Sequence, residues 1–542
     1  MNAKKLIALL LACLMLLSMA ACAGKTETAN TPATDKPASD TPAPAAEADA
    51  PNTNTSDKNL TIVMPSEPSC IWGAPVGKNE NEALTILGAI TDRLVEMDND
   101  TGEVKPSLAT SWEWLDGTHV QMKLREDVTM TDGTPLVADD VAYTVGVWAE
   151  YSPANDTGRF VVGAVADDEH TVTIEFNREA PDLLAMLSWA CFGIVSEDEV
   201  NAAGGLEAAA NNPVVGSGKY RFVEWKNGQY VTLERNENYW NKDYTGYFKT
   251  LTFNFTADAA ARVMAVESGD ADVAYNIPVN QAITYEGRDD LTTLVYTYGQ
   301  ISHVWYNMGE NAGATKDLKV RQAIDLAMDF DAITLVASGG KVQPALGYFE
   351  TNSKYYNETY TAEERAVNVE KAKELLAEAG YPDGLELRCT CLANLVNIWT
   401  VIQGNLAQAG ITLTIETPDT PQFVQEAFGG DYDLILVGEY VAARYPTLFC
   451  FLREENISGG GLVIGGPKWT TPELDAKIAA FIEEKDEATA KQMAGEIEQF
   501  MKENCVVSNL CPETSSTIVA AGLKGFSCYD RGMIDVTNFY YG

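Results

Sequence analysis

The segment from residue 111 to residue 145 constrains the fold of this chain most. Asp116-Gly117 and Asp132-Gly133 are tight-turn signals, because Gly adopts the positive φ that such turns need. Residues 119–124 alternate polar and apolar side chains, which is typical of a strand with one buried face. A helix is expected to begin near Val141, after two Asp residues that suit its N-cap. The segment therefore predicts turn, strand, turn and helix, and we interpret most of it as scaffold.

The N-terminus has the pattern of an export signal. Lys4 and Lys5 precede an apolar run that ends at Ala21, and this run is shorter than the roughly 20 residues of a membrane span. Small residues then precede Cys22, and this arrangement resembles a bacterial lipobox, in which the Cys is lipidated and becomes the new N-terminus. We therefore expect a signal peptide over 1–21 and a lipid on Cys22. The alternative is a plain secretory signal with an incidental Cys.

Residues 22–58 are expected to form a disordered tether. They consist mainly of Thr, Ala, Pro, Asp and Ser, and they contain too few large apolar side chains to offset the chain entropy lost on folding. The formal net charge of the whole chain is −40, which argues against nucleic acid as a partner. The residues after the tether are enough for two or three domains.

The folded part reads as strands alternating with helices, which favours α/β architecture. Asn227-Gly228 between two alternating runs predicts a hairpin. Residues 300–308 and 505–511 are expected to be strands, and 471–503 is expected to be mostly helical. Cys389 and Cys391 share one face of a predicted strand, so we interpret them as buried thiols, with a metal pair as the weaker alternative.

No catalytic motif stands out. The chain has only three His, and it contains neither a His-Glu-x-x-His run nor a Gly-x-Ser-x-Gly run. His303 lies in a predicted strand, where a structural role is the simpler interpretation and contact with a ligand is the other. The pattern favours binding over reaction, and no cofactor is expected.

Several runs resemble the extracellular solute-binding proteins, family 5, which serve oligopeptide, dipeptide and nickel ABC importers. The resemblance lies in the 108–141 segment already described, in the Arg93-Leu94-Val95 run, and in the hairpin and Tyr239-Trp240 that follow Gly216. It continues in Ser268-Gly269-Asp270-Ala271-Asp272, in Val320-Arg321-Gln322-Ala323-Ile324, and in the helix-ending run EKAKELLAEAGYPDG.

The resemblance implies a two-lobed α/β fold of the large periplasmic-binding-protein type (type II), with an extra strand-rich subdomain in the first lobe. We assign 59–300 plus 510–542 to lobe I, with the subdomain at about 85–205, and 301–509 to lobe II. It also implies a monomeric, lipid-anchored receptor at the outer face of the cytoplasmic membrane or in the periplasm. Its expected partners are a small solute, most simply a peptide, an ABC permease and, through the permease, the ATPase subunits.

The resemblance also implies where a solute would lie, namely between the lobes. In relatives that bind peptides an acidic residue shortly before a Pro holds the ammonium group of the peptide. Ala442 stands at that position here, Glu439 is the nearest acid, and Arg444 makes a carboxylate or phosphate an alternative ligand. The full set of expected ligand-binding residues is Trp72, Trp305, Trp399, Glu439, Tyr440, Ala442 and Arg444.

Other functions stay open at this point. The chain has the features expected of a binding lipoprotein for an oligosaccharide or a metal chelate, and of a ligand sensor that works without a transporter. An exported enzyme on an unfamiliar scaffold is the third alternative, and it would need a base and a nucleophile clustered between the lobes. The sequence does not identify the solute.

Overall fold

The computed structural model describes residues 55–72, 80–97, 104–151, 160–177, 183–210, 215–243, 246–351, 353–440, 449, 452–453, 467–528 and 532–542. The expected signal peptide, the lipidation site Cys22 and most of the tether lie outside these residues, as do Ala442 and Arg444. Within the described part of the chain, no helix is long and apolar enough to cross a membrane.

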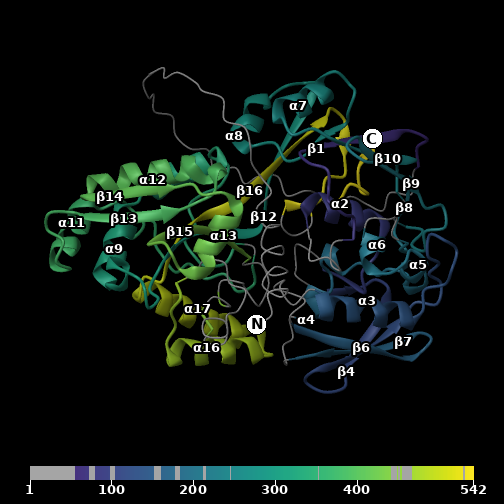
Figure 1. The fold of residues 1–542 in the computed structure, drawn as a ribbon, viewed down its shortest axis with the longest axis horizontal. Coiled ribbons are helices and arrows are strands. Elements are labelled where there is room, and N and C mark those ends of the chain that lie inside the picture. Colours follow the sequence, from purple (N-terminus) through teal and green to yellow (C-terminus); the bar gives the residue numbers. More distant parts are fainter. Residues whose placement is uncertain are drawn as a thin grey trace.

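A ten-stranded sheet runs through the whole molecule (Figure 1). In spatial order its strands are β14 (Ile411–Glu416), β13 (Leu385–Thr390), β15 (Leu434–Tyr440), β12 (Leu291–Tyr306), β16 (Val507–Ala520), β11 (Val273–Ala274), β1 (Asn59–Met64), β10 (Thr250–Phe255), β9 (Tyr230–Arg235) and β8 (Tyr220–Lys226). We call the β1 side the first half and the β13 side the second half. The antiparallel pair β12 and β16 lies between the two and joins them.

The first half combines parallel and antiparallel pairs. β1 pairs in parallel with β10 and β11, while β8 and β9 form the expected hairpin. Its turn uses Gly228 at φ 72°, a value that favours Gly. The surrounding elements are α2 (Asn81–Ile90), α5 (Glu197–Ala202), α6 (Leu206–Ala210), α7 (Ala259–Glu267), α8 (Val279–Ala282) and the short pair β17 (Leu523–Lys524) and β18 (Tyr540–Tyr541).

A separate four-stranded sheet adjoins the first half and contains the strand expected over residues 119–124. Its strands, in spatial order, are β4 (Ala109–Trp114), β5 (His119–Leu124), β7 (Thr171–Phe176) and β6 (Val161–Asp168). α3 (Ala138–Tyr151) and α4 (Leu183–Met186) are next to this sheet (Figure 1). The short strands β2 (Val95–Met97) and β3 (Val104–Pro106), which pair with each other, precede it in the chain.

One boundary of this segment differs from the expectation. α3 begins at Ala138, three residues before Val141. Asp140 therefore lies in the first turn, where its carboxylate accepts the backbone N–H groups of Val137 and Glu197 at 3.1 and 3.0 Å. A carboxylate at this place satisfies backbone donors that a helix start leaves unpaired, so the Asp acts from inside the helix and not from its cap.

The second half is a parallel sheet of β14, β13 and β15 with helices on both sides. Its helices are α9 (Leu318–Ala327), α10 (Phe330–Ser338), α11 (Val369–Glu378), α12 (Val396–Gln408), α13 (Thr420–Gly429), α16 (Pro472–Glu483) and α17 (Glu487–Glu503). Asp317 and Asn368 cap α9 and α11 through their side chains. Cys389 and Cys391 are buried free thiols, as expected.

Two of the sequence runs meet at one buried carboxylate, Asp92, which directly precedes Arg93. It accepts hydrogen bonds from Ser217 Oγ at 2.9 Å, Tyr239 OH at 3.0 Å and Trp240 Nε1 at 2.9 Å. Burial raises the pKa of the Asp92 carboxyl, although two of these donors act in the opposite direction. Residues that lie far apart in the sequence are thus joined around one acceptor, and their role here is structural.

Buried arginines play the same role in both halves. Arg262 of α7 donates to the backbone oxygens of Thr256, Ala257, Tyr275 and Asn276. Arg321 of α9 donates to those of Thr315, Lys316, Asn504 and Cys505. Each guanidinium satisfies four carbonyls that would otherwise lack a donor, so each fixes loops around its own helix.

Candidate functional site

The candidate site lies where β12 and β16 pass between the two halves. β12 is 16 residues long and β16 is 14, so each extends into both halves. Their register shifts between Thr297 and Ile301 and again between Ile301 and His303. Gly299 takes a φ of 81° inside this irregular stretch, and Pro512, which has no N–H, pairs with Ile301. The joining strands are therefore bulged in the middle.

The carboxylate of Glu513 links the two sides of this bulge. It accepts a hydrogen bond from Tyr298 OH at 2.7 Å and another from Ser302 Oγ at 2.8 Å. Its Oε1 also lies where a Cβ of Gly438 in β15 would be, only 2.0 Å away. Burial, together with Glu513, raises the pKa of Tyr298 well above its usual value, so the phenol remains a donor.

His303 marks the other face of β12, because successive strand residues point to opposite sides. Its Nδ1 lies 3.0 Å from Asn509 Oδ1, while Asn509 Nδ2 donates to Gly347 O at 2.9 Å. Because the amide oxygen of Asn509 faces the ring, Nδ1 carries the proton and Nε2 is an acceptor. Burial lowers the pKa of His303 to about 3, so the imidazole is neutral.

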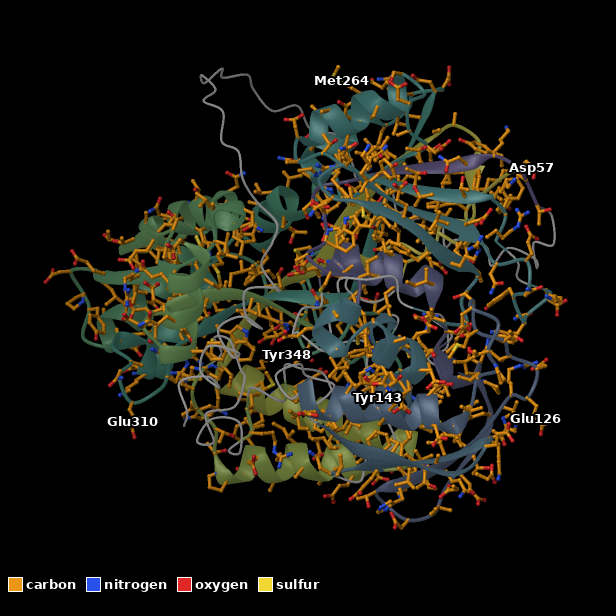
Figure 2. All side chains as sticks on the ribbon, turned by 45° about the vertical axis from the view of Figure 1, so that its right-hand side comes forward. Asp57, Glu126, Tyr143, Met264, Glu310 and Tyr348 are labelled. Carbon is orange, nitrogen blue, oxygen red and sulfur yellow. The ribbon has the colours of Figure 1, made fainter. Side chains whose placement is uncertain are left out.

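The segment 345–351 crosses the joining strands on this face. Ala345 N–H donates to Leu510 O at 2.9 Å, and Gly347 is held by Asn509. Figure 2 labels Tyr348 of this segment, which lies in the central part of the view. Tyr348 belongs to an apolar cluster that also contains Val120 and Ile174 of the small sheet and Ile478 of α16. The apolar side chains of this segment thus belong to a core that is shared by the small sheet and the second half.

Glu350 of this segment contacts the bulge directly. Its carboxyl accepts the backbone N–H of Gly299, and burial raises its pKa to about 7. The side chain belongs to a residue that is only 6% exposed, and Oε1 has no hydrogen-bond partner in the described part of the chain. A buried polar atom without a partner is uncommon, and it calls for an explanation.

Three aromatic residues expected at the site are buried in apolar cores. Trp72 follows β1 and packs in the core of the first half, and Trp399 of α12 packs in that of the second half. Trp305 of β12 lies in the cluster that also contains Tyr348. All three are 0% exposed. Of the three, Trp305 is the one that lies on the same strand face as His303, with the ring centroids 6.2 Å apart.

The remaining expected residues lie on or after β15. Glu439 and Tyr440 end this strand, opposite Ile301 and Gln300 of β12. This register places them beside the bulge. Ala442 and Arg444 lie outside the described residues.

Four residues at the bulge were not expected from the sequence, namely Tyr298, Glu350, Asn509 and Glu513. One signal was present, because Pro512 directly follows the strand expected over 505–511, and a Pro at the end of a strand indicates a bulge or an edge. Nothing in the local pattern at Glu350 indicates that its side chain is buried, since a Glu in a loop is ordinarily exposed.

The chemistry of this arrangement is that of hydrogen bonding. Among the described residues, no group of three or more His, Cys, Asp or Glu could hold a metal ion. The polar groups at the bulge are carboxylates, a neutral imidazole, amides and hydroxyls, which bind polar ligands and can also hold the two halves in register.

A family model supplies the strongest comparison with known proteins. The model described as bacterial extracellular solute-binding proteins, family 5 Middle matches residues 103–449. This match includes the small sheet, most of the first half, β12 and β15.

Curated relatives agree with this match. An oligopeptide-binding protein of Bacillus subtilis, AppA, is 27% identical over 390 residues, which cover 66% of this chain and 69% of that protein. The periplasmic murein peptide-binding protein MppA of Escherichia coli is 22% identical over 465 residues, covering 79% and 83% of the two chains. These relatives are named as binding proteins for solutes, not as enzymes.

Solved structures share the fold. HbpA2 of Haemophilus parasuis has a TM-score of 0.77 at 21% identity, covering 90% of this chain and all of that one. NikA of Brucella suis, solved with Fe(III)-EDTA, has a TM-score of 0.76 at 21% identity with the same coverage. The expected two-lobed α/β fold of the periplasmic binding proteins is confirmed.

Proposed function

Because this chain belongs to the bacterial extracellular solute-binding proteins of family 5, we propose that it captures a small solute between two lobes and delivers it to an ABC permease. Lobe I comprises 59–300 and 510–542, and lobe II comprises 301–509. The observation that carries this proposal is the pair β12 and β16, which joins the two halves through strands bulged at Gly299.

This geometry suits closure around a solute. β12 and β16 are paired on either side of the bulge. The strands can bend at the bulge while the backbone hydrogen bonds on each side of it are kept. Closure removes the solute from water, where its hydrogen bonds and ion pairs become stronger. The solute must bind the closed form better than the open form, since otherwise it would shift no equilibrium.

A peptide is the proposed solute. AppA and MppA are named for peptides, and β15 ends with Glu439 and Tyr440 beside the bulge, where a ligand between the lobes would lie. An acidic solute held by Arg444, or a metal chelate as in the NikA structure, is the second candidate. A micromolar dissociation constant would correspond to about 8 kcal/mol of binding free energy.

The proposed location is the cell envelope, with a lipid on Cys22 and a monomeric binding unit on the tether. The apolar run before Cys22 and the composition of 22–58 support this proposal. Cys22→Ser is expected to move the protein from the membrane fraction to the soluble fraction of its native host. Retention of the variant in the membrane fraction would refute anchoring at this residue.

Binding is tested on the purified protein in two steps. Mass spectrometry first identifies whatever solute co-purifies, and calorimetry then measures its affinity after removal and re-addition. The proposal expects saturation at one solute per chain. If peptides, oligosaccharides and metal chelates all fail to bind to folded protein, the proposed function is wrong.

A further inference from the structure

Two buried acceptors at the bulge have no donor. Glu350 Oε1 and His303 Nε2 are both shielded from solvent, and neither has a hydrogen-bond partner in the part of the chain that the structure describes. His303 is 0% exposed and Glu350 is 6% exposed. Leaving such a group unpaired destabilises the folded protein, and more strongly when the group is charged.

These two acceptors belong to one connected unit. His303 is bonded to Asn509, which donates to Gly347, and three residues later Glu350 accepts the N–H of Gly299. The other nitrogen of His303 and one oxygen of Glu350 are therefore already used to fix their side chains. The orientation of each free acceptor is set before any ligand arrives, which reduces the entropy lost on binding.

The charges around this unit do not supply a partner. Among the described residues, Arg365 is the cation whose charge acts on His303; its guanidinium is paired with Asp325 at 3.1 Å and bonded to the backbone oxygen of Asn509, and its Nε is left without an acceptor there. Burial raises the pKa of Glu350 and the Gly299 N–H acts in the opposite direction, with no charge of the described residues among the causes. A carboxyl buried without a cation is costly once it ionises.

We propose that Glu350 and His303 recognise a cation that donates hydrogen bonds, a protonated amine or guanidinium of the solute. Such a group carries several N–H donors, and a carboxylate and a neutral imidazole accept them. The neutral state of His303 keeps Nε2 available as an acceptor. This inference rests on the proposed function, and it names the chemical class of the solute at that site.

Glu350→Gln tests this assignment, with Glu498→Gln as the matched control. Glu498 is also buried, and one of its oxygens has no hydrogen-bond partner among the described residues, but it lies on α17 and accepts from Thr359, away from the bulge. Calorimetry on both variants and the wild type would use trialanine, agmatine, spermidine and N-acetyl-trialanine. Thermal unfolding of each protein without probe shows that it is folded.

The inference expects at least one of the three basic probes to bind the wild type. Glu350→Gln should weaken that binding about tenfold to a hundredfold, while Glu498→Gln should change it less than about twofold. Equal affinities for wild type and Glu350→Gln would overturn the inference and leave the proposed function intact. Binding of N-acetyl-trialanine alone would have the same consequence. If no probe binds, the inference fails, and the proposed function then depends on whether a solute without a basic group co-purifies and rebinds.

Discussion

The carboxylate of Glu513 occupies the space above Gly438, where a Cβ would come within 2.0 Å of its Oε1. Gly438 is in β15 and Glu513 is in β16, and β12 lies between these strands. The close approach lets Glu513 reach across β12 to Ser302 and Tyr298. The absence of a side chain at Gly438 is thus what allows one carboxylate to hold both sides of the bulge.

Gly438→Ala should therefore destabilise the protein. The new methyl group would displace the carboxylate and break its two hydrogen bonds, at a cost of about 2 kcal/mol. Urea denaturation measures this cost. Gly404→Ala is the control, because Gly404 is inside α12 with nothing within 4 Å of an added Cβ, and it should gain about 0.5–1 kcal/mol. Equal effects of the two substitutions would contradict this role of Gly438.

Glu513→Gln should separate the hydrogen bonds from the shape of the side chain. A Gln amide has one oxygen to accept from Tyr298 or Ser302, so one buried donor would lose its acceptor, at a cost of about 1–3 kcal/mol. Adding Ser302→Ala to Glu513→Gln should cost less than Ser302→Ala costs in the wild type. Strict additivity in this double-mutant cycle would show that the two side chains are not coupled.

Asp92→Ala should be among the more damaging substitutions outside the site. It would leave three donors, those of Ser217, Tyr239 and Trp240, without their acceptor, and we expect a loss of about 4 kcal/mol. Asp92→Asn keeps one acceptor oxygen and should lose roughly half as much. The measurement is the urea midpoint of each variant, and a change below about 1 kcal/mol for Asp92→Ala would refute the structural role assigned to this carboxylate.

The stability of the protein should depend on pH through Glu498. Burial raises the pKa of this carboxyl to about 8, although Thr359, Asn357 and Lys491 act in the opposite direction. The folded-state pKa lies above the unfolded value near 4.3. The contribution of Glu498 to the free energy of unfolding is therefore fully present below about pH 4.3 and is lost as the pH rises to 8. The loss over this window is at most about 5 kcal/mol.

Glu498→Gln removes this titration. Urea midpoints at pH 5, 6.5 and 8 should therefore show that the stability of the variant increases relative to that of the wild type as the pH rises. Parallel curves for the two proteins would mean that Glu498 does not titrate in this window.

Local patterns sufficed to predict several elements of this fold. The strand at 119–124 and the hairpin at Asn227-Gly228 are confirmed, because each depends on residues close together in the chain. The expected strand at 300–308 is in fact part of β12, which starts at Leu291. The N-terminal part of β12 pairs with β16, which is more than 200 residues away in the chain, and no local pattern predicts that pairing.

The site was less predictable for the same reason. Trp305 was expected from its place at the strand crossing, but the burial of Glu350 depends on the packing of 345–351 against β12 and β16. The Glu513 carboxylate fits at the bulge because Gly438, on the third strand β15, has no side chain. These relationships exist only after the two halves are joined, so the sequence indicates the residue types without indicating which of them meet.

The central claim is that this protein binds a solute and releases it unchanged. The most direct measurement is calorimetric titration of ligand-free protein with the solute that co-purifies, followed by mass spectrometry of the solute recovered after prolonged incubation. We predict saturation at one molecule per chain and an unaltered mass. A solute that is chemically converted by the folded protein, or that shows no saturable binding, would contradict this account.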